Sequence, residues 1–227
     1  ASHYTGCISL KSIGDMPKLE SMGQKCFVSC TTLETVGDLS SLKEIPYEAF
    51  DGCTSLVSIG DLNNVESIAN EAFSNCSALE HVDKLDKITS IGQNAFKGCT
   101  ALKSIGSLHN LETIGQGAFS GCSALEHVDD LYSLTRLESG AFAHCASLVS
   151  VDCSDKLTAI GSSAFFGCKA LVSIGDLSNV TSIESSVFRG CIALKSIGNM
   201  PKLESIGMQC FMGCTALETV GDLSSLK

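Results

Sequence analysis

The sequence predicts a repeat solenoid, one continuous stack of about ten 23-residue coils that runs over residues 1–227. Two observations carry this prediction. Nine of the ten phenylalanines recur at intervals of 23 residues, without insertion or deletion, and a cysteine follows each of them three residues later. The register consists of Phe27, Phe50, Phe73, Phe96, Phe119, Phe142, Phe165, Phe188 and Phe211, and Tyr4 with Cys7 extends it by one repeat. Such strict periodicity is typical of stacked repeats.

A third observation gives the elements of each coil. Between one cysteine and the next phenylalanine, apolar residues come in steps of three, a spacing that fits neither a helix nor a flat strand. The residues Leu56, Ile59, Leu62, Val65 and Ile68 show this spacing. A coil of 23 residues is too short for a strand and a long helix. We therefore expect short parallel strands, tight turns, a 3₁₀ or one-turn helical segment around Ala-Phe-x-Gly-Cys, and a right-handed winding.

Glycine marks two further positions of the coil. The glycine after Ile or Val, for example Gly37 and Gly60, predicts a bend or a close approach of neighbouring backbones. The glycine before most ladder cysteines, for example Gly52, is expected to have a positive φ, and Ser29, Asn75 and His144 replace it in three coils. Equivalent residues of successive coils form ladders with a spacing of about 4.8 Å, so ten coils span on the order of 45 Å.

The run from Leu111 to Leu125, Leu-x-x-Ile-Gly-x-x-Ala-Phe-x-Gly-Cys-x-x-Leu, resembles the BspA-like, or treponemal-type, leucine-rich repeats. The resemblance extends over the whole chain. It implies a leucine-rich repeat solenoid and a place on or outside cells, where members are mostly described as adhesins or host-contact proteins. The chain departs from the family where Asp-Leu, as in Asp61-Leu62, replaces the usual Leu-Pro.

The ten in-register cysteines allow three interpretations. A buried ladder of reduced thiols is favoured, because cysteine packs as a small apolar residue. Disulfides between neighbouring coils and a metal site are the alternatives. Parallel side chains do not suit the disulfide dihedral, and a 23-residue interval is not the close spacing of zinc ligands. Cys153 is different, because it replaces the Asp of the Gly-Asp pair; we expect it at the surface as the most reactive thiol.

Histidines and carboxylates recur on one face of the predicted solenoid. His81 and His127 share one repeat position, two coils apart, with Ser104 between them and with Asp83 and Asp129 two residues downstream. At about 4.8 Å per coil, the two histidines lie roughly 10 Å apart, too far for one metal ion. These four residues form either a binding patch or a solvated face.

Exposed binding anchors are few. Aromatic and arginine residues dominate tight protein interfaces, and Tyr47, Tyr132 and Arg136 are the best candidates. The predicted binding residues are therefore His81, Asp83, His127, Asp129, Tyr132 and Arg136. A separate ladder of aspartates is expected to cap turns, with calcium as the alternative. It contains Asp15, Asp38, Asp61, Asp130, Asp176 and Asp222.

Composition and motifs reduce the number of functional classes to which the protein can belong. The net charge of −10 disfavours nucleic-acid and anionic-membrane binding. We find no catalytic motif and expect neither an enzyme nor a cofactor. The prediction is a recognition or adhesion protein of the cell surface or secreted space that binds partner proteins, including host matrix. The alternatives are a filament-forming structural protein and an intracellular scaffold. The chain is expected to be a fragment of a longer array without its own caps, with head-to-tail self-association through its open ends.

Overall fold

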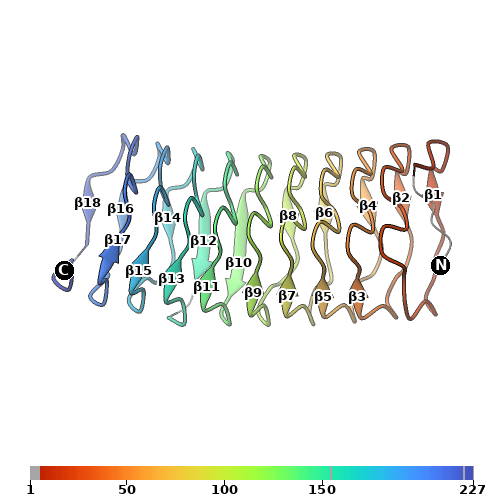
Figure 1. Cartoon of the computed structure of the whole chain (residues 1–227), viewed down its shortest axis with the longest axis horizontal. Coiled ribbons are helices and arrows are strands. Elements are labelled where there is room, and N and C mark those ends of the chain that lie inside the picture. Colours follow the sequence, from red (N-terminus) through yellow and green to blue (C-terminus); the bar gives the residue numbers. More distant parts are fainter. Residues whose placement is uncertain (1–5, 154, 222, 227) are drawn as a thin grey trace.

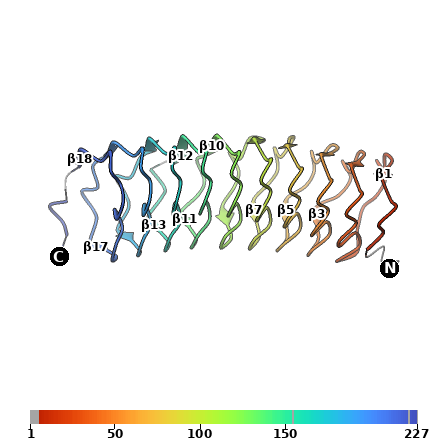
Figure 2. The same ribbon diagram turned by 90° about the horizontal axis from the view of Figure 1, so that it is seen from above.

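The computed structural model describes residues 6–153, 155–221 and 223–226. Their coils stack side by side into an elongated slab, with the two termini at opposite ends (Figures 1 and 2). The described residues form strands and turns, with no helix among them. Accordingly, none of them belongs to a helix that is long and apolar enough to cross a membrane.

Each complete coil contributes two short strands, which form two rows along the slab (Figure 1). The first row precedes the Gly-Asp position. It consists of β1 (Ser12–Ile13), β2 (Thr35–Val36), β4 (Ser58–Ile59), β6 (His81–Val82), β8 (Ser104–Ile105), β10 (His127–Leu131), β12 (Ser150–Cys153), β14 (Ser173–Ile174), β16 (Ser196–Ile197) and β18 (Thr219–Val220).

The second row precedes the Ala-Phe position by a few residues. It consists of β3 (Glu44–Ile45), β5 (Ser67–Ile68), β7 (Ser90–Ile91), β9 (Thr113–Ile114), β11 (Arg136–Leu137), β13 (Ala159–Ile160), β15 (Ser182–Ile183) and β17 (Ser205–Ile206). All pairing is parallel, and residues pair with their equivalents 23 positions away, as Ser67 pairs with Ser90, except that Leu131 pairs with Cys153 across a register shift. The second row is one eight-stranded sheet, whereas the first row divides into sheets of five, three and two strands.

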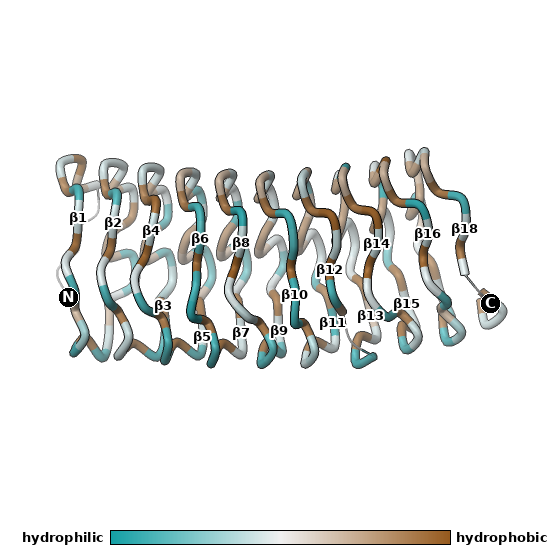
Figure 3. The backbone as a smooth tube through the Cα atoms, turned by 180° about the vertical axis from the view of Figure 1, so that it is seen from behind, coloured by the Kyte–Doolittle hydropathy of each residue, from teal (hydrophilic) through white to brown (hydrophobic). Residues whose placement is uncertain are grey.

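The core consists of the predicted ladders. Leucine, isoleucine and valine at the three-residue steps are mostly buried, and apolar stretches recur at similar heights in successive coils (Figure 3). The nine in-register phenylalanines stack face to face, with ring centroids 5.3–5.7 Å apart. The central rings, such as Phe119, are fully buried. Because every coil buries its apolar residues against its neighbours, the stack has one continuous core.

The segment around Ala-Phe-x-Gly-Cys is a series of turns and not the predicted 3₁₀ or one-turn helical segment. Hydrogen bonds three residues apart are present, as from the Cys53 amide to the Phe50 carbonyl at 3.1 Å. However, Glu48 and Gly52 have φ values of 50° and 73°, and these left-handed residues interrupt any helical run. The positive φ predicted for the residue before each cysteine is confirmed, also where Asn75 or His144 replaces glycine.

The cysteine ladder is a buried thiol ladder. All thirteen cysteines are free, and the in-register ones are buried except Cys7 and Cys214, which are half-buried. The thiol of Cys76 donates to the carbonyl oxygen of Phe50 at 3.1 Å, and other ladder thiols repeat this contact one coil further on. This bond explains why the position holds cysteine: the thiol fills a small apolar site and supplies a donor.

The prediction that Cys153 lies at the surface was wrong. Cys153 ends strand β12, where it pairs with Leu131 across a register shift in β10, and it is only 9% exposed. Burial raises the pKa of its thiol to about 12. The extended strand turns this position inward, so Cys153 is a core residue and not a reactive surface thiol.

Two members of the aspartate ladder cap turns, as predicted. Asp38 Oδ1 accepts the amide of Ser40 at 2.7 Å, and Asp176 Oδ1 accepts that of Ser178 at the same distance. The bonds from Ser178 lower the pKa of Asp176. Asp222 lies outside the described residues. In the part of the chain that is described, no three His, Cys, Asp or Glu side chains are grouped so as to hold a metal ion.

Candidate functional site

The predicted His–Asp face lies on the first row of strands. His81 begins β6 and His127 begins β10, and both imidazoles are exposed. His81 Nδ1 lies 2.8 Å from Ser104 Oγ, and His127 Nδ1 lies 3.1 Å from Ser150 Oγ. Each histidine therefore contacts the serine of the following coil, and Ser104 separates the two histidines as predicted.

Ser104 and His81 do not form a catalytic triad with Glu80. His81 Nε2 lies 3.9 Å from Glu80 Oε2, which is longer than a hydrogen bond. Glu80 instead pairs with Lys103 at 2.7 Å, and this pairing lowers the pKa of the Glu80 carboxyl. Glu80 therefore does not orient the His81 imidazole in the way that the carboxylate of a catalytic triad does.

A shallow groove of about 480 Å³ brings three of the predicted residues together. His81, His127 and Asp129 line it, together with Ser104 and Asp130. Asp83 is exposed near this face but does not line the groove. Asp130 Oδ2 accepts a hydrogen bond from Ser107 Oγ at 2.9 Å, which fixes its carboxylate at the edge of the groove.

Tyr132 and Arg136 do not line this groove. Tyr132 follows β10 and is 51% exposed, and its hydrogen bond with Asp130 raises the pKa of the phenol. Arg136 belongs to β11 in the second row. The structure thus divides the six predicted residues among the first-row face, a turn and the second-row face.

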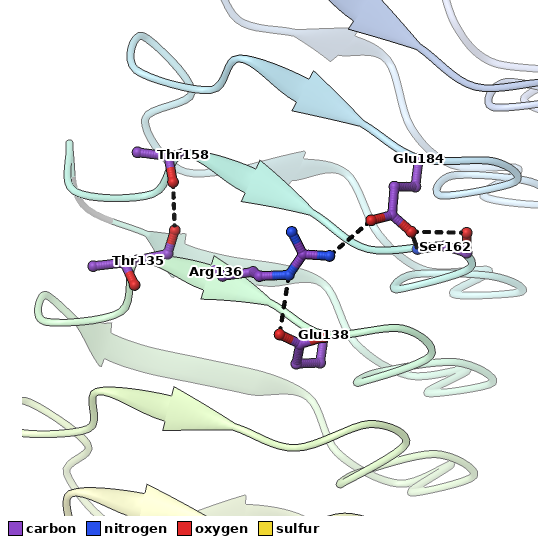
Figure 4. Close-up of polar contacts among 6 residues, drawn as sticks. All are labelled: Thr135, Arg136, Glu138, Thr158, Ser162 and Glu184. Atoms are coloured by element: carbon purple, nitrogen blue, oxygen red, sulfur yellow. Dashed lines mark hydrogen bonds and ion pairs between the residues drawn. The ribbon is translucent and has the colours of Figure 1, made fainter.

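Arg136 is held across coils by carboxylates (Figure 4). Its Nε donates to Glu138 at 3.0 Å and its Nη2 to Glu184, two coils away, at 2.7 Å. Ala159 occupies the Arg136 position in the intervening coil and leaves room for this reach. Burial opposes ionisation of Glu184, but bonds from Ser162 and Arg136 outweigh it and lower its pKa.

A larger groove, of about 680 Å³, follows the second row beside Arg136. Strand residues Ser67, Ser90 and Thr113 line it, and the next small positions are Ala69, Gly92 and Gly115. Tyr47 and Glu44 line one part, and Glu138 lines another. A floor of small side chains between larger ones is a surface on which an extended segment can lie flat.

Tyr47 is fixed in place at this groove. Lys25 Nζ lies 5.0 Å from the centre of its ring and forms an ion pair with Glu48 at 3.0 Å. A hydrogen bond with Glu48 raises the pKa of the Tyr47 phenol. The ring is therefore held by a cation–π contact and a polar contact, which reduces the entropy it loses on binding.

The second-row groove was not predicted from the sequence, where Tyr47 and Arg136 stood out only as separate anchors. The available signal was the run of Ala69, Gly92 and Gly115 at one repeat position, between Pro46 and Glu138. Three consecutive small residues at one ladder position predict a hollow three coils wide.

Three solved structures share the fold. A leucine-rich repeat protein of Treponema pallidum is 25% identical, with a TM-score of 0.50, over 96% of this chain and 81% of that one. A leucine-rich repeat protein of Eubacterium ventriosum is 20% identical, with a TM-score of 0.52 and coverages of 97% and 77%. The pneumococcal vaccine antigen PcpA is 21% identical, with a TM-score of 0.50 and coverages of 96% and 67%.

No curated protein matches the chain. The model of the BspA-type leucine-rich repeat region matches residues 1–103 and 89–218. These matches cover nearly all the coils, and they agree with the two rows of strands and the phenylalanine and cysteine ladders. The chain belongs to the BspA-type leucine-rich repeat family.

Proposed function

We propose that this protein is a non-enzymatic recognition or adhesion protein of the cell surface or secreted space. Its partner is a protein, with host matrix as one class, and it binds in the second-row groove. The observation that carries the proposal is the groove itself: a floor of small side chains three coils wide, lined by Tyr47 in one part and by Glu138, the partner of Arg136, in another. The location is supported by the resemblance of the repeats to a family whose members are found outside cells.

The chemistry of the described residues supports a binding role over a catalytic one. The thiols are the strongest nucleophiles of the chain, but burial raises the pKa of Cys53, Cys99 and Cys145 to about 12. At neutral pH these thiols are protonated and unreactive. The polar groups of the groove are hydroxyls, amides and carboxylates, and such groups suit the recognition of a peptide backbone.

Filling the groove tests the proposal. Thr113→Arg and Ser90→Arg place long side chains on its floor, at positions equivalent to Arg136, so the fold tolerates them. Thr35→Arg on the first row is the matched control. Binding to a panel of purified extracellular-matrix proteins is measured by surface plasmon resonance. We expect the two groove variants to lose binding at least tenfold and the control to retain it. Equal loss in all three variants, or no binding by the parent protein, would contradict the proposal.

Head-to-tail self-association is a second proposal, supported by one apolar groove. In the first described coil, Cys7, Leu10, Ile13, Met16 and Phe27 line a hollow of about 350 Å³. Apolar surface of this kind favours association, and the net charge of −10 opposes it, so salt should promote it. Light scattering should show oligomers that grow with salt and concentration; a monomer at all salt concentrations would exclude this assembly.

A further inference from the structure

One edge of the solenoid changes its character at Ala146. We call this surface the turn edge; it consists of the residue after each ladder phenylalanine and the residue after each ladder cysteine. Before Ala146 these positions are mostly small or polar, as Ser74, Ser77, Ser120 and Ser123 show. Beyond Ala146 most of them hold larger groups. These groups are Phe166, Lys169, Arg189, Ile192 and Met212.

The polar stretch of the turn edge is satisfied by its own contacts. Ser77 Oγ donates to the Thr54 carbonyl oxygen at 3.3 Å, and Thr100 and Ser123 continue this chain of bonds at 3.2 Å. Ala146 ends it, because alanine has no hydroxyl group. The hydroxyl ladder therefore explains the first stretch of the edge but gives no structural reason for the second.

The second stretch forms an apolar hollow of about 500 Å³. Phe166, Ile192 and Met212 line it, and Ile192 and Met212 are 49% and 53% exposed. The glycines between them, such as Gly190, stack on their neighbours with room for a Cβ at 3.7 Å. Exposed apolar groups beside an open backbone floor are typical of a docking surface.

Two cations and an imidazole surround this hollow. The Arg189 guanidinium lies 5.6 Å from the centre of the Phe166 ring, and the His144 ring meets that ring edge-on at 5.0 Å. Lys169 completes the lining, to which no carboxylate contributes. Arg189 donates to the neutral Gln209, and neither cation forms an ion pair among the described residues. In a chain with 25 acidic and 15 basic residues, this local excess of positive charge is unusual.

We propose that the stretch formed by His144, Phe166, Lys169, Arg189, Ile192 and Met212 binds an acidic peptide segment of a partner protein, with an aliphatic or aromatic side chain in the hollow. The apolar floor supplies contact area for that side chain. Lys169 and Arg189 complement carboxylates on either side of it, and Arg189 is pre-oriented by Phe166 and Gln209. This surface is separate from the second-row groove, so either proposal can fail alone.

The test is selection from a displayed library of random 12-residue peptides on the parent protein, with counter-selection on an edge variant. That variant carries Phe166→Ser, Lys169→Ser, Arg189→Ser, Ile192→Thr and Met212→Ser. Other coils have Ser or Thr at these same ladder positions, so the variant should fold; circular dichroism and the melting temperature check this. We expect enriched peptides that combine Asp or Glu with Leu, Ile or Phe.

Fluorescence anisotropy with one enriched peptide then separates the two contributions. Lys169→Ser with Arg189→Ser should weaken binding roughly fivefold or more and remove most of its salt dependence. Ile192→Thr with Met212→Ser should weaken it to a similar extent at every salt concentration. Lys97→Ser, which removes a lysine from the polar stretch of the same edge, is the matched control and should bind like the parent.

Three outcomes would overturn the proposal. The first is that no peptide is enriched against the edge variant. The second is that the enriched peptides are basic or lack an apolar residue. The third is that Lys169 and Arg189 are needed for the binding of another molecule and not for the binding of the acidic peptide. Heparin as that molecule would assign the surface to a polyanion, and a second copy of the protein would assign it to self-association.

Discussion

The two rows of strands have the same 23-residue period but not the same continuity. The second row is one eight-stranded sheet, whereas the first row divides between β8 and β10 and again between β14 and β16. In the second row, a Cβ on Gly92, Gly115, Gly161 or Gly207 would lie 2.7 Å or less from the backbone of the preceding coil. Gly60 and Gly175 in the first row approach as closely, whereas a Cβ on Gly198, across the break between β14 and β16, would meet no atom within 4 Å. A Cβ on Gly106 would lie 3.2 Å from the Lys84 amide nitrogen, although β6 and β8 pair.

Acidic residues at the glycine position show how the rows differ. In the second row, Glu138 and Glu184 are each followed one coil later by glycine, which gives the larger residue room. In the first row, Asp129 and Asp152 follow one another directly, and there β10 and β12 lengthen and shift register. Equal spacing in sequence therefore does not ensure equal stacking; a glycine in one of two neighbouring coils allows the closest approach.

The largest expected effect is on the core that both rows share. Burial raises the pKa of the Cys53, Cys99, Cys145 and Cys153 thiols from 9.0 to about 12. A raised folded-state pKa means that the unfolded thiol ionises first, so the stability present below pH 9 is lost as pH rises toward 12. In this pH window, each such thiol lowers the free energy of unfolding by about 1.4 kcal/mol per pH unit.

Urea unfolding at pH 7.5, 9 and 10 checks this expectation when it is monitored by hydrogen exchange and mass spectrometry. Short peptides that contain β4, β6 or β8 and short peptides that contain β5, β7 or β9 should unfold at one common midpoint, which falls steeply above pH 9. Separate midpoints for the two rows would show that they do not share a cooperative core. A midpoint that is constant up to pH 10 would show that the thiols are not buried.

The second effect compares equivalent isoleucines of one coil. Ile114 in the second row is 1% exposed, whereas Ile105 in the first row is only partly buried. We expect Ile114→Ala to destabilise the fold by about 2–5 kcal/mol and Ile105→Ala by roughly half as much, because a half-buried site relaxes around the lost atoms. Denaturant unfolding measures both. Equal costs would mean that the rows pack equally well.

The third effect tests the glycines themselves. A Cβ on Gly115 would lie 2.5 Å from the Gln93 amide nitrogen, whereas one on Gly106 would lie 3.2 Å from that of Lys84. Gly115→Ala should therefore cost about 1–3 kcal/mol through forced backbone movement, and Gly106→Ala less than about 1 kcal/mol. Thermal unfolding compares the two variants; the reverse order would contradict the expectation that the closer approach makes the added Cβ more destabilising.

The smallest effect concerns the ion pairs on the two faces. Arg136 contacts two carboxylates in the second row, and Lys103 contacts Glu80 in the first. All of these side chains are about 40–50% exposed. Because solvent screens such ion pairs, Arg136→Ala and Lys103→Ala should each lower the free energy of unfolding by less than about 1 kcal/mol. We expect Arg136→Ala to lower the free energy of unfolding slightly more than Lys103→Ala does at low salt, and we expect both losses to vanish in 1 M NaCl. A cost that persists in salt would point to packing by the Arg136 stem.

Much of the fold followed from period and composition. In a solenoid each residue packs on its own equivalent 23 positions away, so the Phe register and the buried Cys ladder could be predicted from the sequence. The turn-capping role of Asp38 followed in the same way, because it depends on local hydrogen bonding. The candidate site followed only in part: the His81–Ser104–His127 order was correct, but the groove beside Tyr47 and Arg136 was not foreseen.

By itself, the sequence determined which residues face the core, because the apolar steps of three and the 23-residue period leave one consistent stacking. Only the tertiary structure decided how closely neighbouring coils approach at each position. That distance depends on the side chains of two neighbouring coils together. For this reason only the structure showed that Cys153 faces the core, that the first row has two breaks and that Arg136 reaches past Ala159 to Glu184. A repeat fixes which residues are neighbours, whereas the volumes and charges of those neighbours fix the surface between them.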